Sequence, residues 1–407
     1  MLEEQPSAAD LDLIAEFEPR FEMLDANSLV ALAENAPLGD GGVHASNLLA
    51  QALEKDPHHH AAHLLKEQLH QMFVPRWHFP MLADTVRNQA YAKAIAAKVQ
   101  PGDIVLDIGC GAGLTAMLAA RAGAKHVYAI EGQPLIAAAA KQVIADNNLS
   151  DKITVLSKWS HELIIGEDLP NRADVVVSEI VDSNLLGEGA LATLTHAMEH
   201  LAKPNARAVP ESGTLKAQLV ESAGLRNQYR PLEAEGFDLS AFHKFANVAQ
   251  VTPNDSAACG LRPLGPTNDL FHFDFTCPDM SHGKTTVPLF CTAVGTAHAV
   301  VVSFDMVLAP GISVSNDLNT DGHWGRFSYL LEQATPVSIG SQVTITAQHD
   351  ATKLSVSIHD TAQVERPIIW QRGVTTRTPT AHETTQPNAT WYVPDAQDGP
   401  VSDRPVH

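Results

Sequence analysis

The stretch ADVVVSEIVDSNLLGEGA, residues 173–190, constrains the fold of this chain more than any other. Its β-branched run Val175-Val176-Val177 predicts a short strand buried on both faces, as in a parallel sheet. Glu179 stands where that strand should end, and Glu188 follows between two glycines. Ligands of open α/β sheets bind beyond the carboxyl ends of the strands. Two carboxylates at that place favour a metal ion or a planar cation such as a guanidinium, which each can bind bidentately.

A second segment, IVLDIGCGAGLTAMLAARAGAKHVYAIE at 104–131, has the pattern of a cofactor-binding unit. It predicts a buried strand, a glycine-rich loop, a helix and a second strand ending in Glu131. Gly109, Gly111 and Gly113 let the backbone turn sharply and approach a ligand that side chains would exclude. Glu131 can accept hydrogen bonds from a ribose. The segment therefore predicts a nucleotide-like cofactor.

The N-terminal residues 1–72 are predicted to be helical, because apolar residues recur at three- and four-residue spacing. The run LLAQALEKDPHHHAAHLL resembles the junction of two tetratricopeptide repeats, so this segment is expected to serve a partner or self-association. Its histidines could suggest a metal, but adjacent histidines at a helix start are more typical of a solvated surface. No metal site is predicted there; the residues concerned are His58, His59, His60 and His63.

From residue 209 the pattern changes to alternating apolar and polar residues, which predicts an antiparallel β-domain over 209–382, a barrel or a sandwich. The run SQVTITAQHDATKLSVSIHD predicts two paired strands. An insertion at about 222–248 is too long for a hairpin loop, and we expect a helical arm that docks on a second subunit. Residues 383–407 are polar and proline-rich and are expected to form a flexible tail.

Composition limits the classes of partner. The chain has 407 residues and a formal charge of −20, from 47 acidic and 27 basic residues. This balance disfavours nucleic acid as a partner and suits a cationic substrate, although many acidic enzymes owe their charge to solubility alone. Neither a membrane span nor a secretory signal is recognisable, so a cytoplasmic location is expected. Four widely spaced cysteines are predicted to be free thiols.

Five segments, taken together and in order, resemble the protein arginine methyltransferases over roughly residues 73–380. They are MLADTVR, VLDIGCGAG, YAIE, SEIVDSNLLGEG and GHWGRFSYLL. The sequence of SEIVDSNLLGEG, the segment that carries Glu179 and Glu188, is closest to that of the monomethylating branch of the family. The resemblance implies an α/β fold: a Rossmann-like S-adenosylmethionine methyltransferase domain over 73–208, then an antiparallel β-barrel domain with a helical dimerisation arm.

The resemblance also implies roles for individual residues. Arg87 would pair with the carboxylate of S-adenosylmethionine, and Glu131 would hold the ribose hydroxyls. Glu179 and Glu188 would bind the substrate guanidinium, in a pocket shaped by Trp324. Asp84 and His323 would form an acid–base pair. The remaining cofactor contacts would come from Met81, His78, Asp107, Gly109, Gly111, Gly113, Ser160 and His161.

Two departures from the family pattern concern the substrate channel. Tyrosines that usually precede the MLADTVR segment are missing, with Phe73 and Trp77 the nearest aromatic residues, and Gly322 replaces a threonine. These departures bear on the identity of the substrate more than on the type of reaction, and a reshaped channel would suit a small substrate. From the resemblance as a whole we expect an arginine N-methyltransferase that acts as a homodimer on a protein or peptide arginine and adds one methyl group. The alternatives are an enzyme for free L-arginine or another small guanidine, and a non-catalytic scaffold working through the N-terminal helices and the arm.

Overall fold

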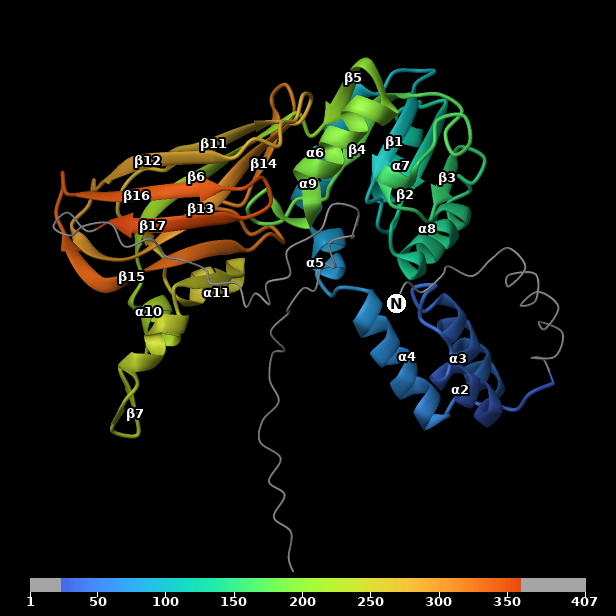
Figure 1. Ribbon diagram of the computed structural model, residues 1–407, viewed down its shortest axis with the longest axis horizontal. Helices are drawn as coiled ribbons and strands as arrows, with labels where there is room; N and C mark the ends of the chain where they lie inside the picture. The colour runs from blue at the N-terminus through green and yellow to red at the C-terminus, as the bar shows by residue number, and fades with distance from the viewer. Residues whose placement is uncertain (1–22, 360–407) are drawn as a thin grey trace, which may run out of the picture. The chain divides into compact units, whose positions relative to one another are not determined.

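The computed structural model describes residues 23–359 of the chain (Figure 1). The predictions for residues 1–22, for the tail at 383–407 and for the end of the β-domain after residue 359 lie outside the described part. Within residues 23–359 no helix is both long enough and apolar enough to cross a bilayer. The cytoplasmic location stays a prediction.

Three helices at the N-terminus share a small apolar core of their own, lined by Leu29, Leu48, Leu49 and Ala52. They are α2 (Ala26–Glu34), α3 (Val43–Lys55) and α4 (His60–Phe73). His59, just before α4, has a structural role: its Nδ1 atom accepts a hydrogen bond from the backbone of Ala62 and so caps the helix. Among residues 23–359 no group of three or more His, Cys, Asp or Glu side chains could hold a metal ion.

A five-stranded parallel sheet forms the centre of the first half. Its strands are β1 (Ile104–Ile108), β2 (His126–Ile130), β3 (Ile153–Leu156), β4 (Ala173–Ser178) and β5 (Ala202–Val209), in the order β3-β2-β1-β4-β5. Helix α6 (Thr85–Lys98) precedes β1, and α7 (Leu114–Arg121), α8 (Pro134–Asp146) and α9 (Ala190–His196) lie between successive strands. The Rossmann-like prediction is confirmed. Strand order reverses between β1 and β4, which is where open α/β sheets bind ligands.

The second half is antiparallel, as predicted. Strand pairing gives a seven-stranded sheet around β6 (Ser212–Glu221), β13 (Gly295–Ala309) and β15 (Arg326–Val337), and a three-stranded sheet. The first is completed by β9 (Val248–Val251), β10 (Arg262–Pro263), β11 (Asn268–Asp274) and β14 (Ile312–Ser315). The second comprises β12 (Gly283–Phe290), β16 (Gln342–His349) and β17 (Leu354–His359). The predicted pair of strands is β16 and β17.

The insertion between β6 and β9 contains helical turns, as predicted for the arm, and also a hairpin that was not predicted. It contains α10 (Ala223–Tyr229), a two-stranded hairpin of β7 (Glu233–Ala234) and β8 (Phe237–Asp238), and a 3₁₀ turn (Ser240–Phe245). Glu235 and Gly236 both have positive φ, at 51° and 80°. Two such residues in succession form the turn that connects tight hairpins, so the chain reverses here and does not continue as a helix.

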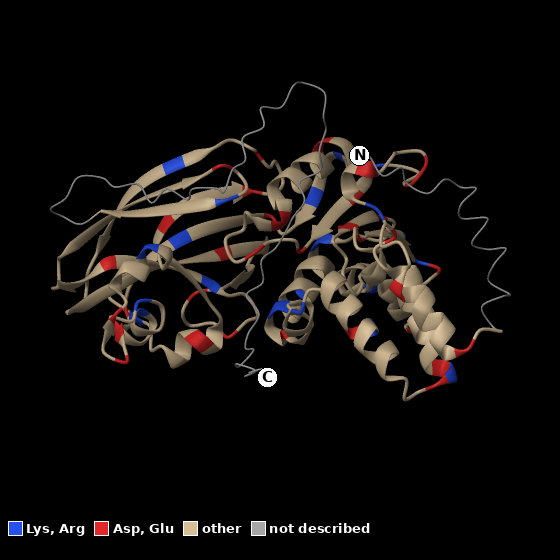
Figure 2. Ribbon diagram, turned by 60° about the horizontal axis from the view of Figure 1, so that its bottom comes forward, with Lys and Arg blue, Asp and Glu red and all other residues tan. Residues whose placement is uncertain are grey.

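Charged residues are distributed over both halves of the described chain. Figure 2 shows Lys and Arg interspersed with Asp and Glu along the helices and strands of each half. Several of these charges pair locally, as Lys216 does with Asp305 on neighbouring strands. The prediction that nucleic acid is not a partner stays a prediction.

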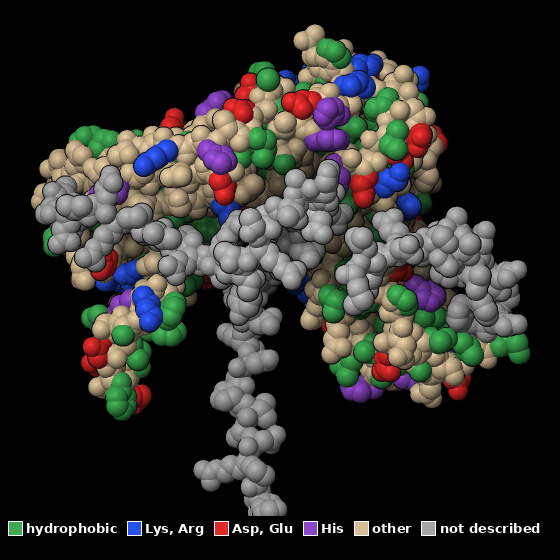
Figure 3. Space-filling model, in the orientation of Figure 1, with side chains coloured by type: hydrophobic (Ala, Val, Ile, Leu, Met, Phe, Trp, Pro, Cys, Tyr) green, Lys and Arg blue, Asp and Glu red, His purple; other side chains and the backbone are tan. Residues whose placement is uncertain are grey.

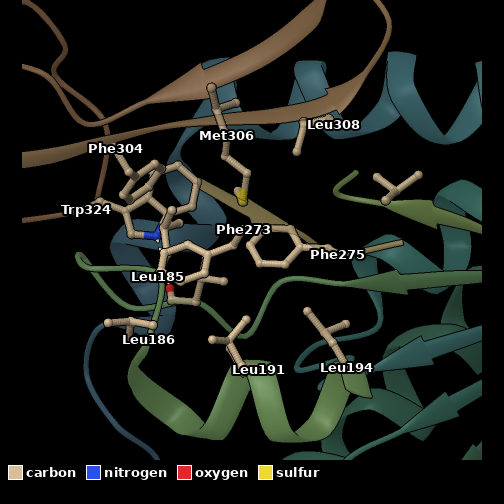
Figure 4. Close-up of a cluster of buried hydrophobic side chains, with 14 of the residues drawn as sticks. Leu185, Leu186, Leu191, Leu194, Phe273, Phe275, Phe304, Met306, Leu308 and Trp324 are labelled. Carbon is tan, nitrogen blue, oxygen red and sulfur yellow. Dashed lines mark hydrogen bonds between the residues drawn. The ribbon is translucent and has the colours of Figure 1, made fainter. Parts of the chain in front are cut away.

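One apolar cluster joins the loop after β4 to strands of the antiparallel half (Figure 4). Leu185 and Leu186 come from that loop and are almost completely buried. Their neighbours in the cluster include Leu191 and Leu194 of α9, and Phe273, Phe275, Phe304, Met306, Leu308 and Trp324. Gly213 of β6 makes room for this contact, because a Cβ atom there would lie 2.5 Å from Leu185. The loop that carries both glutamates is therefore held by the hydrophobic core.

Candidate active site

Three segments that carry predicted site residues leave the parallel sheet at neighbouring strand ends. The glycine-rich loop follows β1, Glu131 follows β2 and Glu179 follows β4. Since β1 pairs with both β2 and β4 in parallel, their carboxyl ends lie at one edge of the sheet. The structure thus brings the predicted cofactor loop and the first glutamate together at the switch in strand order.

The glycine-rich loop is packed closely on its surroundings. Gly109 has φ 70°, and a Cβ atom on it would lie 2.4 Å from the side chain of Ile180, the residue after Glu179. Glu131 fixes the loop from the other side: Oε2 accepts from the backbone of Gly111 at 3.0 Å, and Oε1 accepts from Gln133 at 2.8 Å. Burial raises the pKa of Glu131 despite these bonds. The carboxylate retains lone pairs for a further donor.

Asp107, inside β1, is fully buried and has one partnered oxygen. Its Oδ2 atom accepts a hydrogen bond from Thr115 at 2.7 Å, whereas Oδ1 has no partner within the described chain. Burial raises the pKa of this carboxyl to about 7, although Thr115 and the backbone of α7 lower it. A buried carboxylate oxygen without a donor is costly unless a ligand supplies one.

Arg87, near the start of α6, forms a buried ion pair with Glu179, through Nη2 and Oε2. Nη1 donates to Asn88 at 2.9 Å, the guanidinium carbon lies 5.0 Å from the ring centre of Tyr91, and Nε has no partner among the described residues. Burial raises the pKa of Glu179, and the charge of Arg87 opposes that rise. The first predicted guanidinium ligand is thus already paired with a guanidinium of this chain.

Glu188 has surroundings unlike those of Glu179. It has φ 57°, which is unusual for a residue with a side chain, and it has no ion-pair partner among residues 23–359. The side chain is exposed on one side, but protein surrounds the carboxylate elsewhere. This loss of solvent, with the charges of Glu179, Asp182 and Glu131, raises its pKa to about 7. Strained backbone of this kind clusters at functional sites.

Asp84 and His323 meet, although they are 239 positions apart. Asp84 caps α6 by accepting from the backbone of Arg87, and its other oxygen accepts from His323 N at 3.0 Å and from Nδ1 at 3.1 Å. Burial lowers the pKa of His323 to about 4, against the attraction of Asp84. Burial alone would raise the pKa of Asp84, but its hydrogen bonds outweigh that effect and lower it. The imidazole is therefore neutral at pH 7, with Nε2 as its acceptor.

The other predicted residues lie around this group. Trp324 is buried, lies against His323 with the ring centres 4.1 Å apart and the planes tilted by 37°, and donates from Nε1 to the backbone of Val181 at 3.4 Å. Met81 is buried at the end of α5 (His78–Ala83), and His78 stacks on Trp77 at 4.0 Å. Gly113 begins α7, Ser160 is buried in a short 3₁₀ turn, and the neighbouring His161 is exposed. The contacts of these residues with a cofactor or substrate stay predictions.

Two residues that the sequence analysis missed also shape the site. Asp182 folds the loop between the two glutamates by accepting three backbone hydrogen bonds. Tyr91 is fully buried under Arg87 and donates to the backbone of Ser178 at 3.2 Å. Asp182 carried a usable signal, since Asp followed two residues later by Asn, with glycine further on, is typical of a side chain that bonds its own loop. Tyr91 carried none beyond its apolar spacing in α6.

The donors and acceptors left over fit S-adenosylmethionine. The amino-acid end of that molecule carries a carboxylate and an ammonium group, which match the unpartnered Nε of Arg87 and the unpartnered Oδ1 of Asp107 in the described chain. Its ribose hydroxyls need an acceptor, and Glu131 follows β2 at the required edge of the sheet. The residues predicted from the sequence to hold this cofactor are therefore chemically suited to it.

Comparison with known sequences supports the same class of protein. A family model described as ribosomal protein L11 methyltransferase (PrmA) matches residues 89–233. An arginine N(omega)-methyltransferase from Streptomyces achromogenes subsp. streptozoticus is 38% identical over 286 residues, which cover 70% of this chain and 79% of that protein. Protein arginine N-methyltransferase 7 from Cricetulus longicaudatus is 32% identical over 355 residues, covering 78% of this chain but only 50% of that longer protein.

Solved structures confirm the fold. The Trypanosoma brucei PRMT1 enzyme–prozyme heterotetrameric complex with AdoHcy has a chain that aligns with a TM-score of 0.62 at 21% identity, covering 71% of this chain and 95% of the other. Protein arginine methyltransferase 10 of Arabidopsis thaliana aligns with a TM-score of 0.57 at 18% identity, covering 70% and 93%. Because each alignment covers more than two thirds of this chain, it extends over both the parallel and the antiparallel half.

Proposed function

The chain belongs to the arginine N-methyltransferase family, whose methyl donor is S-adenosylmethionine, and we propose that it transfers a methyl group from that donor to a guanidino nitrogen of arginine. The observation that carries the proposal is the pair of carboxylates on the loop after β4, beside the glycine-rich loop. Bound S-adenosylmethionine supplies an electrophilic methyl group on a positively charged sulfur. The chain's own residues bind and orient the acceptor and remove its proton.

The two glutamates would orient and polarise the substrate. A guanidinium keeps its proton at any physiological pH, so its nitrogens are poor nucleophiles until charge is redistributed. Glu179 and Glu188 can hold it on two sides, draw positive charge toward one nitrogen and leave electron density on another. The catalytic contribution is then orientation and electrostatic stabilisation, which account for much of enzymatic rate enhancement.

The Asp84–His323 pair would take the proton that leaves the methylated nitrogen. Because Nδ1 of His323 faces Asp84, Nε2 is the free acceptor. An imidazole that is neutral at pH 7 can accept a proton, and the Asp84 carboxylate stabilises the imidazolium that forms. This division of roles requires both residues.

Free L-arginine is the acceptor that we favour, with a protein or peptide arginine as the second candidate. The Streptomyces relative is named for arginine, and this chain covers 79% of it, whereas it spans about half the length of the protein arginine N-methyltransferase 7 relatives. The tyrosines usual ahead of MLADTVR are also absent, and Trp77 is 43% exposed beside His78. We infer addition of a single methyl group, on the likeness of EIVDSNLLGEGAL to the monomethylating branch.

Mass spectrometry tests the proposal directly. Purified protein is incubated with S-adenosylmethionine and, in parallel, with free L-arginine or an arginine-rich peptide. A gain of one methyl on free arginine supports the favoured acceptor, and a gain on the peptide alone supports the second. If neither substrate is methylated although calorimetry shows that the protein binds S-adenosylhomocysteine, arginine is not the acceptor. The assignment of the cofactor then still holds.

A homodimer formed through the arm is part of the same proposal. The arm residues Leu232, Phe237, Phe242 and Phe245 are each 69–72% exposed, and Figure 3 shows apolar side chains at this end of the molecule. Exposed apolar groups of this size favour a protein contact. Light scattering should give the mass of two chains, and Phe242→Asp should reduce it to one. A monomeric wild-type protein at micromolar concentration would contradict this part.

A further inference from the structure

Asp182 lies between the two glutamates and organises the backbone that separates them. Its Oδ1 atom accepts hydrogen bonds from the backbone nitrogens of Asn184, Leu186 and Gly187, at 2.9, 3.2 and 3.0 Å. No ion-pair partner for its carboxylate exists among residues 23–359. A carboxylate that accepts three backbone donors fixes the path of a loop much as a cap fixes a helix end.

Gly187 is shaped to admit this carboxylate. A Cβ atom on Gly187 would lie 2.5 to 2.7 Å from three atoms of the Asp182 side chain, closer than real contacts allow. Its φ is not positive, so the lack of a side chain serves space and not an unusual backbone conformation. Asp182 and Gly187, five residues apart, therefore fix the loop together: one supplies the acceptor and the other the space for it.

The loop held in this way is strained. Leu185 and Glu188 have φ of 62° and 57°, a region that residues with side chains rarely adopt. Such a conformation persists only where the surroundings enforce it. Leu185 is anchored by the apolar cluster of Figure 4, whereas Glu188 is exposed and lies outside that cluster. Two hydrogen bonds restrain its backbone: Gly187, the residue before Glu188, donates to Asp182, and Ala190 donates to the carbonyl of Gly187 and closes the turn.

We propose that Asp182 is the positioning residue for Glu188, holding its backbone so that its carboxylate faces the substrate guanidinium together with Glu179. The proposal rests on the proposed function, since it assumes that Glu188 binds a guanidinium. It predicts that Asp182 acts through its acceptor atom and through Gly187, without touching the substrate.

The charge of Asp182 has a separate effect that an experiment can isolate. The charged groups that act on Glu188 are Glu179, Asp182 and Glu131, and each raises the pKa of Glu188. Asn at position 182 keeps an oxygen acceptor for the three backbone donors but carries no charge. The loop should then keep its shape while Glu188 ionises at lower pH.

The first experiment compares Asp182→Asn with Asp182→Ala. For Asp182→Ala we expect the KM for L-arginine to rise about tenfold or more, the loss typical of hydrogen bonds to a charged acceptor, with an unchanged affinity for S-adenosylhomocysteine. For Asp182→Asn we expect kcat/KM within about threefold of wild type at pH 8, and a lower midpoint of the kcat/KM–pH profile. If Asp182 only stabilised the fold, replacing it with Asn would not shift the midpoint of the kcat/KM–pH profile.

A double-mutant cycle tests the coupling with Gly187. Gly187→Ala should raise the KM in the wild-type background and add less to Asp182→Ala, because two of the three clashing atoms are removed with the carboxylate group, whereas the Cβ atom at 2.7 Å remains. Asp350→Ala is the matched control, since Asp350 also accepts three hydrogen bonds from its own turn, in the loop between β16 and β17. It should leave the KM for L-arginine unchanged.

Hydrogen exchange keeps the test independent of the reaction. The amides of Asn184, Leu186 and Gly187 should lose protection in Asp182→Ala and keep it in Asp182→Asn, whether or not arginine is the substrate. Absence of wild-type turnover on any arginine substrate contradicts the proposed function, while this exchange pattern still decides the positioning role. The inference is overturned if these amides keep their protection in Asp182→Ala, or if they lose it equally in Asp182→Asn and Asp182→Ala.

Discussion

Glu179 and Glu188 are the same residue type on one loop, and the fold gives them opposite surroundings. Glu179 ends a strand, is buried and is paired with Arg87. Glu188 stands on a strained turn, is partly open to solvent and has no cation beside it in residues 23–359. If the loop binds a guanidinium as proposed, the two carboxylates would have different parts: Glu179 is held in place by Arg87, and Glu188 is left without a cation of the protein's own.

Replacing each glutamate by glutamine gives the largest effect that we expect. Both Glu179→Gln and Glu188→Gln should lower kcat/KM by roughly 100-fold or more, since each removes a charge that stabilises the transition state. Only Glu179→Gln should also destabilise the fold, by about 3 kcal/mol, because it leaves the Arg87 charge buried without its counter-charge. Steady-state kinetics and thermal denaturation check the two halves of this prediction.

Equal melting temperatures for the two variants would contradict the idea that Glu179 is tied to the fold and Glu188 is not. Affinity for S-adenosylhomocysteine serves as the control for Glu188→Gln alone, because Glu179 pairs with Arg87, the residue expected to bind the cofactor carboxylate.

The pH profile should report Glu188 when S-adenosylmethionine is saturating, a condition that keeps Asp107, whose pKa is also raised to about 7, from affecting the profile through cofactor binding. A carboxyl whose pKa is raised to about 7 is protonated and neutral below that pH, and a neutral carboxyl cannot hold a guanidinium. We expect kcat/KM for arginine to rise about tenfold per pH unit below 7 and to level off above it. His323, with a pKa of about 4, should add no inflection between pH 5 and 9. A profile that is flat from pH 5.5 to 8 would show that Glu188 is already ionised.

Binding of the two ligands should be coupled through Arg87. The guanidinium of Arg87 and that of the substrate compete for Glu179, and S-adenosylhomocysteine offers Arg87 another carboxylate. Saturating S-adenosylhomocysteine should therefore tighten arginine binding, roughly fivefold or more by calorimetry. Arg87→Met should abolish that dependence. If the affinity for arginine is the same with and without the cofactor product, the two guanidinium groups do not compete.

Asp107 gives the smallest expected effect. It is buried, as Glu179 is, but like Glu188 it has no ion-pair partner within residues 23–359, so it shows the effect of burial without that of an ion pair. Its folded pKa of about 7 exceeds the ordinary value of 3.8, so unfolding releases a proton between those values and stability falls as pH rises through that window. Asp107→Asn should melt a few degrees higher than wild type at pH 8 without cofactor, and the difference should vanish toward pH 4. Scanning calorimetry across this range checks the trend, and a constant offset between the two proteins would contradict a raised pKa for Asp107.

Local pattern was enough to predict the parallel strands, the glycine-rich loop and the position of Glu131, because each depends on residues within one βαβ unit. The hairpin in the arm was missed because Glu235 and Gly236 override a stretch of helix-forming residues. The Arg87–Glu179 pair could not be foreseen from spacing, since it joins residues 92 positions apart. The sequence indicated that both residues belong to the site, but not that one would neutralise the other.

The residues of the candidate site are also synthesised at different times. The glycine-rich loop, Glu131, Glu179 and Glu188 all stand in the first half of the chain, whereas His323 reaches Asp84 only across 239 positions. During synthesis from the N-terminus, the residues proposed for the methyl donor and for the guanidinium are complete long before His323, the proposed proton acceptor, is made. A chain cut after the parallel sheet would carry Asp84 as a helix cap without its histidine, so in the proposed mechanism the second half of the molecule supplies the proton acceptor as well as covering the core.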